Sequence, residues 1–191
     1  LNIRITGEAG QGIVSAGMML CRMYKDSGRH VFAIQDYMSR IRGGNNFFQV
    51  RASVRPVYAP RQKADIIIAL DKEAVKANKA ALAPGGLLIL DAEKFAGKEL
   101  EKGWLNAPIY ALAQETGGPR YANAVALGII AALTCENFED AGKAVDREFS
   151  AKGGEVSAKN RQAARKGYEH AAENMKGRAF RIAAAPHNHN C

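Results

Sequence analysis

The chain has 191 residues, of which 47% are hydrophobic and 24% are charged, and its formal net charge is +8. This length and hydrophobic content predict one compact domain with a real core, and they exclude the composition typical of disordered chains. No apolar run reaches the roughly 20 residues needed to span a bilayer, and the N-terminus lacks a charged segment followed by an apolar one. We therefore expect a cytoplasmic protein without a membrane partner.

The first elements follow a strand–loop–helix pattern. A short β-rich run at residues 2–6 enters the glycine-rich segment GEAGQG at residues 7–12. The apolar stretch that follows has helical periodicity and predicts a helix that stops at Gly28. The residues expected on its buried face are Ile13, Ala16, Gly17, Leu20 and Tyr24.

Two further strands are predicted, one before and one after a polar turn. The turn lies within the sequence QDYMSRIRGGNNFFQV at residues 35–50. Residues 30–35 form the first strand. Residues 46–54 form the second, in which apolar and polar residues alternate, as expected of a strand at a sheet edge with one wetter face. At least one of Phe47 and Phe48 should face the core. The continuous apolar run at residues 64–70 then predicts a buried parallel strand.

The remaining pattern alternates between strands and helices and then becomes helical. Asp71 is a natural N-cap for the next helix, residues 84–91 form a glycine turn and a buried strand, and residues 107–112 predict a shorter strand. Three helices follow after residue 120. Asn137 is the expected N-cap of the second, and the third is basic and expected to be exposed.

These elements predict an α/β fold: a Rossmann-like, three-layer arrangement with a mostly parallel sheet, helices on both faces and a helical C-terminal part. We expect residues 1–178 to form a single domain, with residues 120–178 as its helical part. Residues 179–191 are expected to be a tail or the start of a linker.

The cysteine pattern predicts neither a disulfide framework nor an iron–sulfur ligand set, because the three cysteines are widely spaced. We expect Cys21 and Cys135 to be buried, inert thiols in a reducing compartment. His187, His189 and Cys191 could bind a metal, but no second ligand cluster supports a site there, so no metal site is predicted.

The glycine loop is the first candidate site, because glycine backbone and a helix N-terminus together favour an anion. Gly7 and Gly12 match the outer positions of a dinucleotide-binding fingerprint, Ala9 stands at its middle glycine, and Asp36 could take the role of the ribose-binding acid. A stand-alone Rossmann-type nucleotide-binding enzyme is one hypothesis. A close-packed junction that faces a partner or a shared ligand is favoured. The candidate residues are Gly7, Glu8, Ala9, Gly10, Gln11 and Gly12. A methyltransferase is a weaker alternative, because Thr6 stands where an acid is usual.

The polar turn is the second candidate site. Seven basic residues and one acid lie between Arg29 and Lys63, and this imbalance indicates an anionic partner or a solvated basic face. The arginines of the turn can form forked bonds to phosphate or carboxylate, and its glycines permit close approach. The candidate residues are Ser39, Arg40, Arg42, Gly43, Gly44 and Asn45. A purely structural interface loop is the alternative.

Three segments in this order resemble one family. GEAGQGIVSAG, DYMSRIRGGNNFFQVRAS, and NAVALGIIAAL followed by EFSAKGGEVSAKNRQAARKGYEHA are similar to the gamma subunit, or gamma domain, of 2-oxoacid:ferredoxin oxidoreductases. The resemblance covers roughly residues 2–175. The form of the turn is most similar to 2-oxoglutarate-type or broad 2-oxoacid enzymes, within the wider pyruvate/ketoisovalerate oxidoreductase gamma family.

The resemblance implies a supporting role in the oxidative decarboxylation of a 2-oxoacid with coenzyme A. Acyl-CoA and CO₂ would be the products, and the electrons would pass to ferredoxin. Thiamine diphosphate, Mg²⁺ and iron–sulfur clusters would belong to the other domains, so this chain is expected to bind no cofactor alone and to have no catalytic residue of its own. Its implied partners are alpha and beta subunits or domains. A nucleic-acid-binding module is the remaining alternative, suggested by the charge, but no recognised nucleic-acid motif is present.

Overall fold

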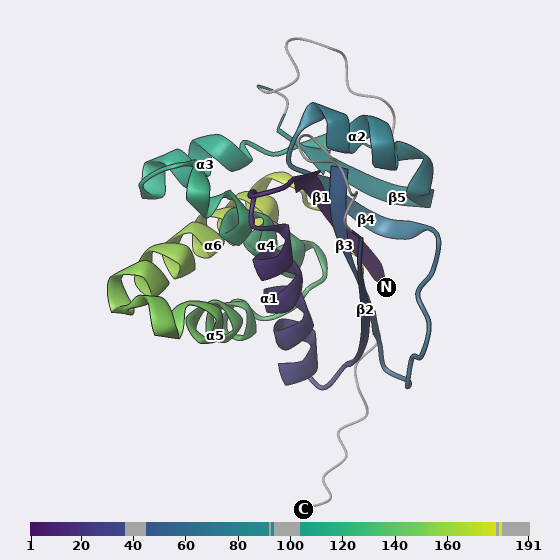
Figure 1. The fold of residues 1–191 in the computed structure, drawn as a ribbon, viewed down its shortest axis with the longest axis horizontal. Helices are drawn as coiled ribbons and strands as arrows, with labels where there is room; N and C mark the ends of the chain where they lie inside the picture. Colours follow the sequence, from purple (N-terminus) through teal and green to yellow (C-terminus); the bar gives the residue numbers. More distant parts are fainter. Residues whose placement is uncertain (37–44, 92, 94–103, 179, 181–191) are drawn as a thin grey trace, which may run out of the picture.

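The computed structural model describes residues 1–36, 45–91, 93, 104–178 and 180 (Figure 1). Its centre is a six-stranded sheet with the order β2-β3-β1-β4-β5-β6. The strands are β1 (Asn2–Glu8), β2 (His30–Asp36), β3 (Asn45–Ser53), β4 (Ala64–Ala69), β5 (Leu82–Leu90) and β6 (Trp104–Asn106). Strands β1, β4, β5 and β6 pair in parallel, whereas β3 is antiparallel to both β1 and β2. The prediction of a mostly parallel α/β sheet is confirmed.

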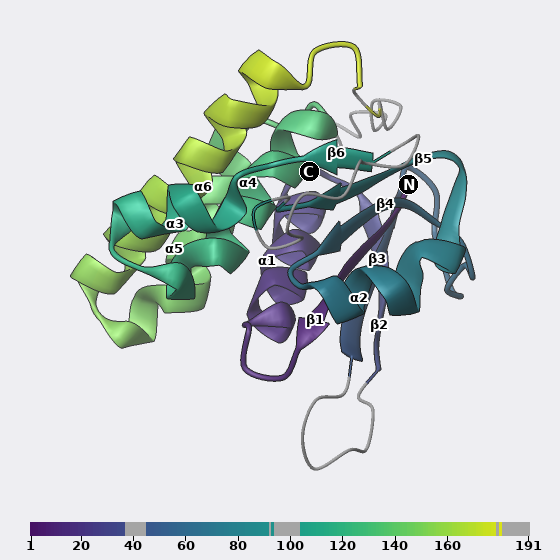
Figure 2. The ribbon, with the colours of Figure 1, turned by 90° about the horizontal axis from the view of Figure 1, so that it is seen from above.

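Helices cover both faces of this sheet, as predicted. They are α1 (Ile13–Asp26), α2 (Lys72–Asn78), α3 (Ile109–Thr116), α4 (Ala122–Leu133), α5 (Phe138–Phe149) and α6 (Gly154–Asn174), with short 3-10 turns η1 (Lys79–Ala81), η3 (Pro119–Tyr121) and η4 (Ser150–Lys152). Figure 2 shows α2 on one side of the sheet and α1 with the C-terminal helices on the other. The larger hydrophobic core lies on the α1 side, and a smaller one lies beneath α2. Among the described residues, no helix is both long and apolar enough to cross a bilayer.

Several local predictions are confirmed. Asp71 caps α2, because its Oδ1 accepts a hydrogen bond of 2.7 Å from the Ala74 N–H, and Asn137 caps α5 in the same way through the Glu139 N–H at 3.0 Å. Gly28 follows the end of α1 with a φ of 77°, the left-handed conformation typical of a helix stop. The apolar residues predicted for the inner face of α1 are all buried.

The position predicted for β3 is wrong, because this strand lies between β2 and β1 rather than at the sheet edge. Its pairing with β1 runs from Asn2↔Arg51 to Glu8↔Asn45. The alternation of apolar and polar residues in β3 does not come from exposure of one face to solvent. Phe48 is buried on the α1 side, which confirms that at least one of the two phenylalanines faces the core, whereas Gln49 is only 1% exposed on the other face. There Gln49 accepts hydrogen bonds from Arg4 and donates one to the Arg61 carbonyl, so the polar face is covered rather than wet.

The strand predicted at residues 107–112 is also wrong. The short strand β6 ends at Asn106, and α3 begins at Ile109 after Pro108. The Asp91 Oδ2 atom accepts a hydrogen bond of 2.8 Å from the Tyr110 N–H in the first turn of α3. This capping interaction joins residues 19 positions apart. Pro108 is the local sign of the helix start, whereas the Asp91 acceptor cannot be recognised from the neighbouring sequence.

The third C-terminal helix is less exposed than its basic sequence predicts. α6 packs along α4 through a buried face of small residues that includes Ala163, Ala164 and Gly167. A methyl group at Gly167 would overlap the Val125 carbonyl, and one at Gly128 of α4 would overlap the Ala164 carbonyl. The two helix backbones are therefore in direct contact, and this contact requires glycine on both sides.

We expect Gly128→Ala to destabilise the protein by about 2 kcal/mol, because the added methyl must push α6 away from α4. Urea unfolding followed by far-ultraviolet circular dichroism measures this change. Gly154→Ala is the matched control, because the space around Gly154 at the start of α6 is open and the change should lie within about 0.5 kcal/mol of the original stability. Equal stability of the two variants would contradict the close helix contact.

The two described cysteines differ, which corrects the prediction that both are buried. Cys21 is partly buried on α1, whereas Cys135 is exposed just after α4. Cys135 has a φ of 56°, the left-handed conformation, because the chain reverses here towards α5. Burial raises the pKa of the Cys21 thiol to about 11, which keeps it protonated at neutral pH. Cys191, His187 and His189 lie outside the described residues.

We expect iodoacetamide at pH 8 to modify Cys135 about tenfold faster than Cys21, because Cys135 is exposed, whereas burial restricts access to Cys21 and raises the pKa of its thiol. Peptide mass spectrometry over a time course measures both rates in one sample. The reactivity of Cys21 should rise only as the pH approaches its raised pKa, or after unfolding in urea. Equal rates in the folded protein would contradict this difference in burial.

Candidate functional site

The glycine loop joins the end of β1 to the start of α1, as predicted. Gly10 and Gly12 have φ values of 92° and 73°, which favour glycine. At Gly7 a methyl group would overlap the end of the Gln11 side chain, so a larger residue there would displace Gln11. Gly12 directly precedes α1, and no side chain caps this helix. The loop therefore leaves the positive end of α1 without a side-chain acceptor.

Hydrogen bonds hold the loop in place. The Glu8 N–H donates to Gln11 Oε1 at 2.8 Å and to Asp71 Oδ2 at 2.9 Å. Gln11 Nε2 donates to the Tyr110 hydroxyl at 3.3 Å, and that hydroxyl donates to the Leu70 carbonyl at 2.9 Å. The loop is thus tied both to the start of α2 and to α3.

The Tyr110 hydroxyl stays protonated in this network. Burial, with the nearby carboxylates of Asp71, Asp91 and Glu8, raises the pKa of Tyr110 to about 12. At neutral pH the group is therefore a hydrogen-bond donor with a fixed acceptor. Gln11 and Tyr110 hold the loop with these polar groups.

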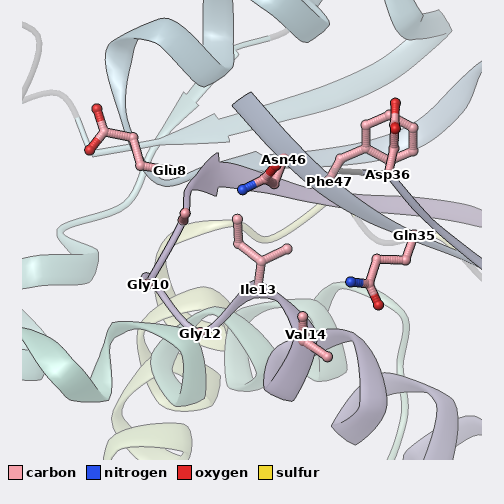
Figure 3. Close-up of a pocket in the computed structure, with 10 residues that line it drawn as sticks. Glu8, Gly10, Gly12, Ile13, Val14, Gln35, Asp36, Asn46 and Phe47 are labelled. Carbon is pink, nitrogen blue, oxygen red and sulfur yellow. The ribbon is translucent and has the colours of Figure 1, made fainter. Parts of the chain in front are cut away.

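A hollow of about 270 Å³ lies between the glycine loop and the ends of β2 and β3 (Figure 3). Its lining residues are Glu8, Ala9, Gly10, Gly12, Ile13, Val14, Gln35, Asp36, Asn46 and Phe47. Figure 3 shows the Glu8 carboxylate turned away from the hollow and the Asn46 amide above Ile13. Loop backbone, apolar side chains and the exposed Asp36 therefore line this hollow together.

The structure brings the glycine loop next to both ends of the predicted polar turn. β2 ends at Asp36, β3 begins at Asn45, and Asn45 is the register partner of Glu8. Asn45 Oδ1 accepts a hydrogen bond of 2.7 Å from the Thr6 hydroxyl, so this residue of the turn has a structural contact. The turn residues Ser39, Arg40, Arg42, Gly43 and Gly44 lie outside the described residues.

Sequence reasoning missed several residues around the loop. Tyr110 and Arg120 line a second hollow of about 320 Å³ together with Gly10, Gln11 and Gly12. Asn123 approaches Gly12 so closely that its Nδ2 atom would lie 2.6 Å from a methyl group there. Asn123 is the one polar residue in the apolar sequence of α4, which is a usable signal. Tyr110 and Arg120 carry no such signal, because they reach the loop only through the tertiary fold.

We expect Asp71→Ala to lower the free energy of unfolding by about 2 kcal/mol, because it removes both the cap of α2 and the acceptor for the Glu8 N–H. Urea unfolding measures the loss, and hydrogen exchange should show faster exchange of the Glu8 amide. Glu73→Ala is the matched control, since Glu73 is an exposed acid in the same helical turn. A loss of similar size in both variants would contradict the anchoring role of Asp71.

A glycine-rich strand–loop–helix unit on a mostly parallel sheet, with a packed helical layer, defines a Rossmann-like α/β domain. The family model described as pyruvate ferredoxin/flavodoxin oxidoreductase matches residues 2–170. The chain belongs to this family. The resemblance inferred from its three motifs is therefore confirmed.

Two curated relatives illustrate the range of the family. The 2-oxoglutarate synthase subunit KorC of Methanocaldococcus jannaschii is 30% identical, over 90% of this chain and 94% of that protein. The ketoisovalerate oxidoreductase subunit VorA of Methanothermobacter thermautotrophicus is 27% identical, over 93% of this chain but only 38% of that protein. The chain thus spans little more than a third of the longer VorA relative.

Solved structures likewise include both a longer chain, of which this chain covers a part, and a chain of similar length. A 2-oxoglutarate:ferredoxin oxidoreductase from Magnetococcus marinus, with 2-oxoglutarate, coenzyme A and succinyl-CoA bound, is 31% identical with a TM-score of 0.87, over 96% of this chain and 33% of that chain. The gamma subunit of a keto/oxoacid ferredoxin oxidoreductase from Geobacter sulfurreducens is 30% identical with a TM-score of 0.73, over 89% of this chain and 97% of that chain.

The described residues do not fit the metal cofactors that the family implies. Iron–sulfur clusters take cysteine thiolates, and Mg²⁺ takes oxygen ligands. Within the described ranges, no group of three or more His, Cys, Asp or Glu residues could hold a metal ion. The hollow beside the glycine loop instead offers loop backbone, a helix N-terminus and the Asp36 carboxylate.

Proposed function

We propose that the chain is the gamma subunit, or gamma domain, of a 2-oxoacid:ferredoxin oxidoreductase of the 2-oxoglutarate-like type. It would support the CoA-dependent oxidative decarboxylation of a 2-oxoacid to acyl-CoA and CO₂, with electrons passed to ferredoxin. The observation that carries this proposal is the 30% identity over nearly the whole length of KorC, within a family match over residues 2–170. The Magnetococcus marinus structure, which binds 2-oxoglutarate and coenzyme A, supports the same substrate class.

In this proposal the chain acts with alpha and beta subunits or domains in the cytoplasm, and it is not catalytic alone. Thiamine diphosphate and the iron–sulfur clusters would be held by those partners, with ferredoxin reached through the whole enzyme. The arrangement of the glycine loop supports a binding role, because Gln11 and Tyr110 hold the loop in place rather than acting on a substrate. The relatives do not favour a stand-alone nucleotide-binding enzyme.

The glycine loop and the polar turn would form one binding surface. The proposed contacts of Ser39, Arg40, Arg42, Gly43, Gly44 and Asn45 are CoA phosphates, the 2-oxoacid carboxylate or acidic side chains of a partner. The position of the flanking residues supports this joint role, since Asp36 lines the hollow of the glycine loop and Asn45 pairs with Glu8. Arginine is suited to each of these contacts, because its guanidinium binds phosphate and carboxylate with two parallel hydrogen bonds.

The double variant Arg40→Ala, Arg42→Ala tests this surface in the assembled enzyme. If the turn contacts CoA, the KM for CoA should rise about tenfold or more while the subunits stay associated, because two charge-assisted contacts are lost. If it contacts the 2-oxoacid, the KM for that substrate should rise instead. If it contacts a partner, the enzyme should dissociate at lower salt during size-exclusion chromatography.

Arg55→Ala, Arg61→Ala is the matched control. Both arginines are exposed in the segment between β3 and β4, so this variant removes the same charge from a different part of the basic region. It should leave assembly and both KM values within about twofold of the original enzyme. If the Arg40, Arg42 variant behaves like this control in every assay, the ligand and the interface versions of the proposal both fail.

A further inference from the structure

A third hollow of about 300 Å³ lies among the helices and shares only Gly12 with the hollow of Figure 3. Its walls come from the start of α1, from η3 and α4, and from η4 and α6. We name it the helical hollow; its lining includes Ser15, Arg120, Asn123, Lys152 and Asn160. Its volume is sufficient for a small organic ligand.

A buried amide in the helical hollow lacks a partner. Asn160 on α6 is only 3% exposed. Its Nδ2 atom donates to the Val156 carbonyl at 2.8 Å, one turn back along the helix. Its Oδ1 atom is buried and accepts no hydrogen bond from any described residue. Because the Val156 carbonyl fixes the orientation of the amide, Oδ1 is left without a donor among the described residues.

Two cations line the same hollow, and each lies over an aromatic ring. The Arg120 guanidinium lies 5.0 Å from the centre of the Tyr121 ring, and Lys152 Nζ lies 5.2 Å from the centre of the Phe149 ring. Both rings also line the hollow. The lining includes no carboxylate among the described residues, and the nearby Glu155 is paired with Lys159 at 2.8 Å. The hollow is therefore electropositive.

The start of α1 adds neutral donors and a positive dipole end. Gly12 precedes the 14-residue helix without a capping side chain, and Ser15 in its first turn lines the hollow. Asn123 also lines it, close to Gly12. A ligand here would therefore meet positive charge on one side and the unpaired Asn160 oxygen on another. An anion alone would leave that oxygen without a donor.

We propose that the helical hollow binds a small organic anion that carries a hydroxyl group close to its charged head. The head, a phosphate or a carboxylate, lies between Arg120 and Lys152 near the start of α1, and the hydroxyl donates a hydrogen bond to Asn160 Oδ1. Since Gly12 belongs to both this hollow and the glycine loop, a ligand bound here contacts the loop from the side of the helical layer.

Isothermal titration calorimetry on the full chain, with paired probes, tests this proposal. Glycerol 3-phosphate is compared with propyl phosphate, and lactate with propionate, so that each pair shares a head and differs in hydroxyl groups. We expect the hydroxyl-bearing member of the preferred pair to bind about tenfold more tightly than its twin. The pair that binds more tightly identifies the head as phosphate or carboxylate.

Variants assign the binding to this hollow. Arg120→Gln, Lys152→Gln should weaken binding of the preferred pair about tenfold or more, whereas Arg55→Gln, Lys72→Gln, which removes the same charge elsewhere on the surface, should not. Asn160→Ala should abolish the preference for the hydroxyl without abolishing binding. A thermal melt checks that each variant is folded, and the exposed Arg120 and Lys152 keep the test valid if Asn160→Ala unfolds.

The result is independent of the function proposed above, because it needs no partner subunit. Binding that persists in the Arg40→Ala, Arg42→Ala background places the probe outside the polar turn. The proposal is overturned if no probe binds at about 10 mM, if both members of each pair bind equally, or if Arg120→Gln, Lys152→Gln binds as well as its control.

Discussion

The backbone amide of Glu8 is the point on which the site depends. It donates to Gln11 from within the loop and to Asp71 from the start of α2, at 2.8 and 2.9 Å. This shared contact ends β1, fixes the turn of the glycine loop and so sets where α1 begins. Because Gly12 then lies against Asn123, the helical layer is positioned by the same loop. Gly12 is a lining residue of all three hollows.

The charge of the chain is distributed in two different ways. On α6 the basic residues have acidic neighbours within the fold, since Arg161 pairs with Glu139 and Asp146, and Lys166 pairs with Glu115. Such exposed pairs contribute little stability, but they neutralise the helix that suggested a nucleic-acid partner. Arg120 and Lys152 have no such ion pair among the described residues and lie over aromatic rings instead. Cations that lie beside a hollow and form no close ion pair are better placed for an anionic ligand.

Sequence patterns predicted correctly those features that depend on interactions between residues close together in the chain. The caps at Asp71 and Asn137, the stop at Gly28 and the inner face of α1 each depend on residues within a few positions of one another. The errors in α3 and β3 concern partners that are distant in the sequence. α3 is capped by Asp91 from another part of the chain, and β3 is covered on its polar face by Arg4 and the segment around Arg61. No local window contains these contacts.

The sequence by itself determined the α/β class, the glycine loop, the family and the polar turn as a candidate, because glycine conformations, apolar periodicity and ordered motifs are properties of the chain. The tertiary structure alone decided that β2, and not β3, is an edge strand and that both ends of the turn lie beside the loop. It also decided that Tyr110, Arg120 and Asn160 surround the same region. Those residues come from α3, η3 and α6, and only the packing of these elements against α1 brings them together.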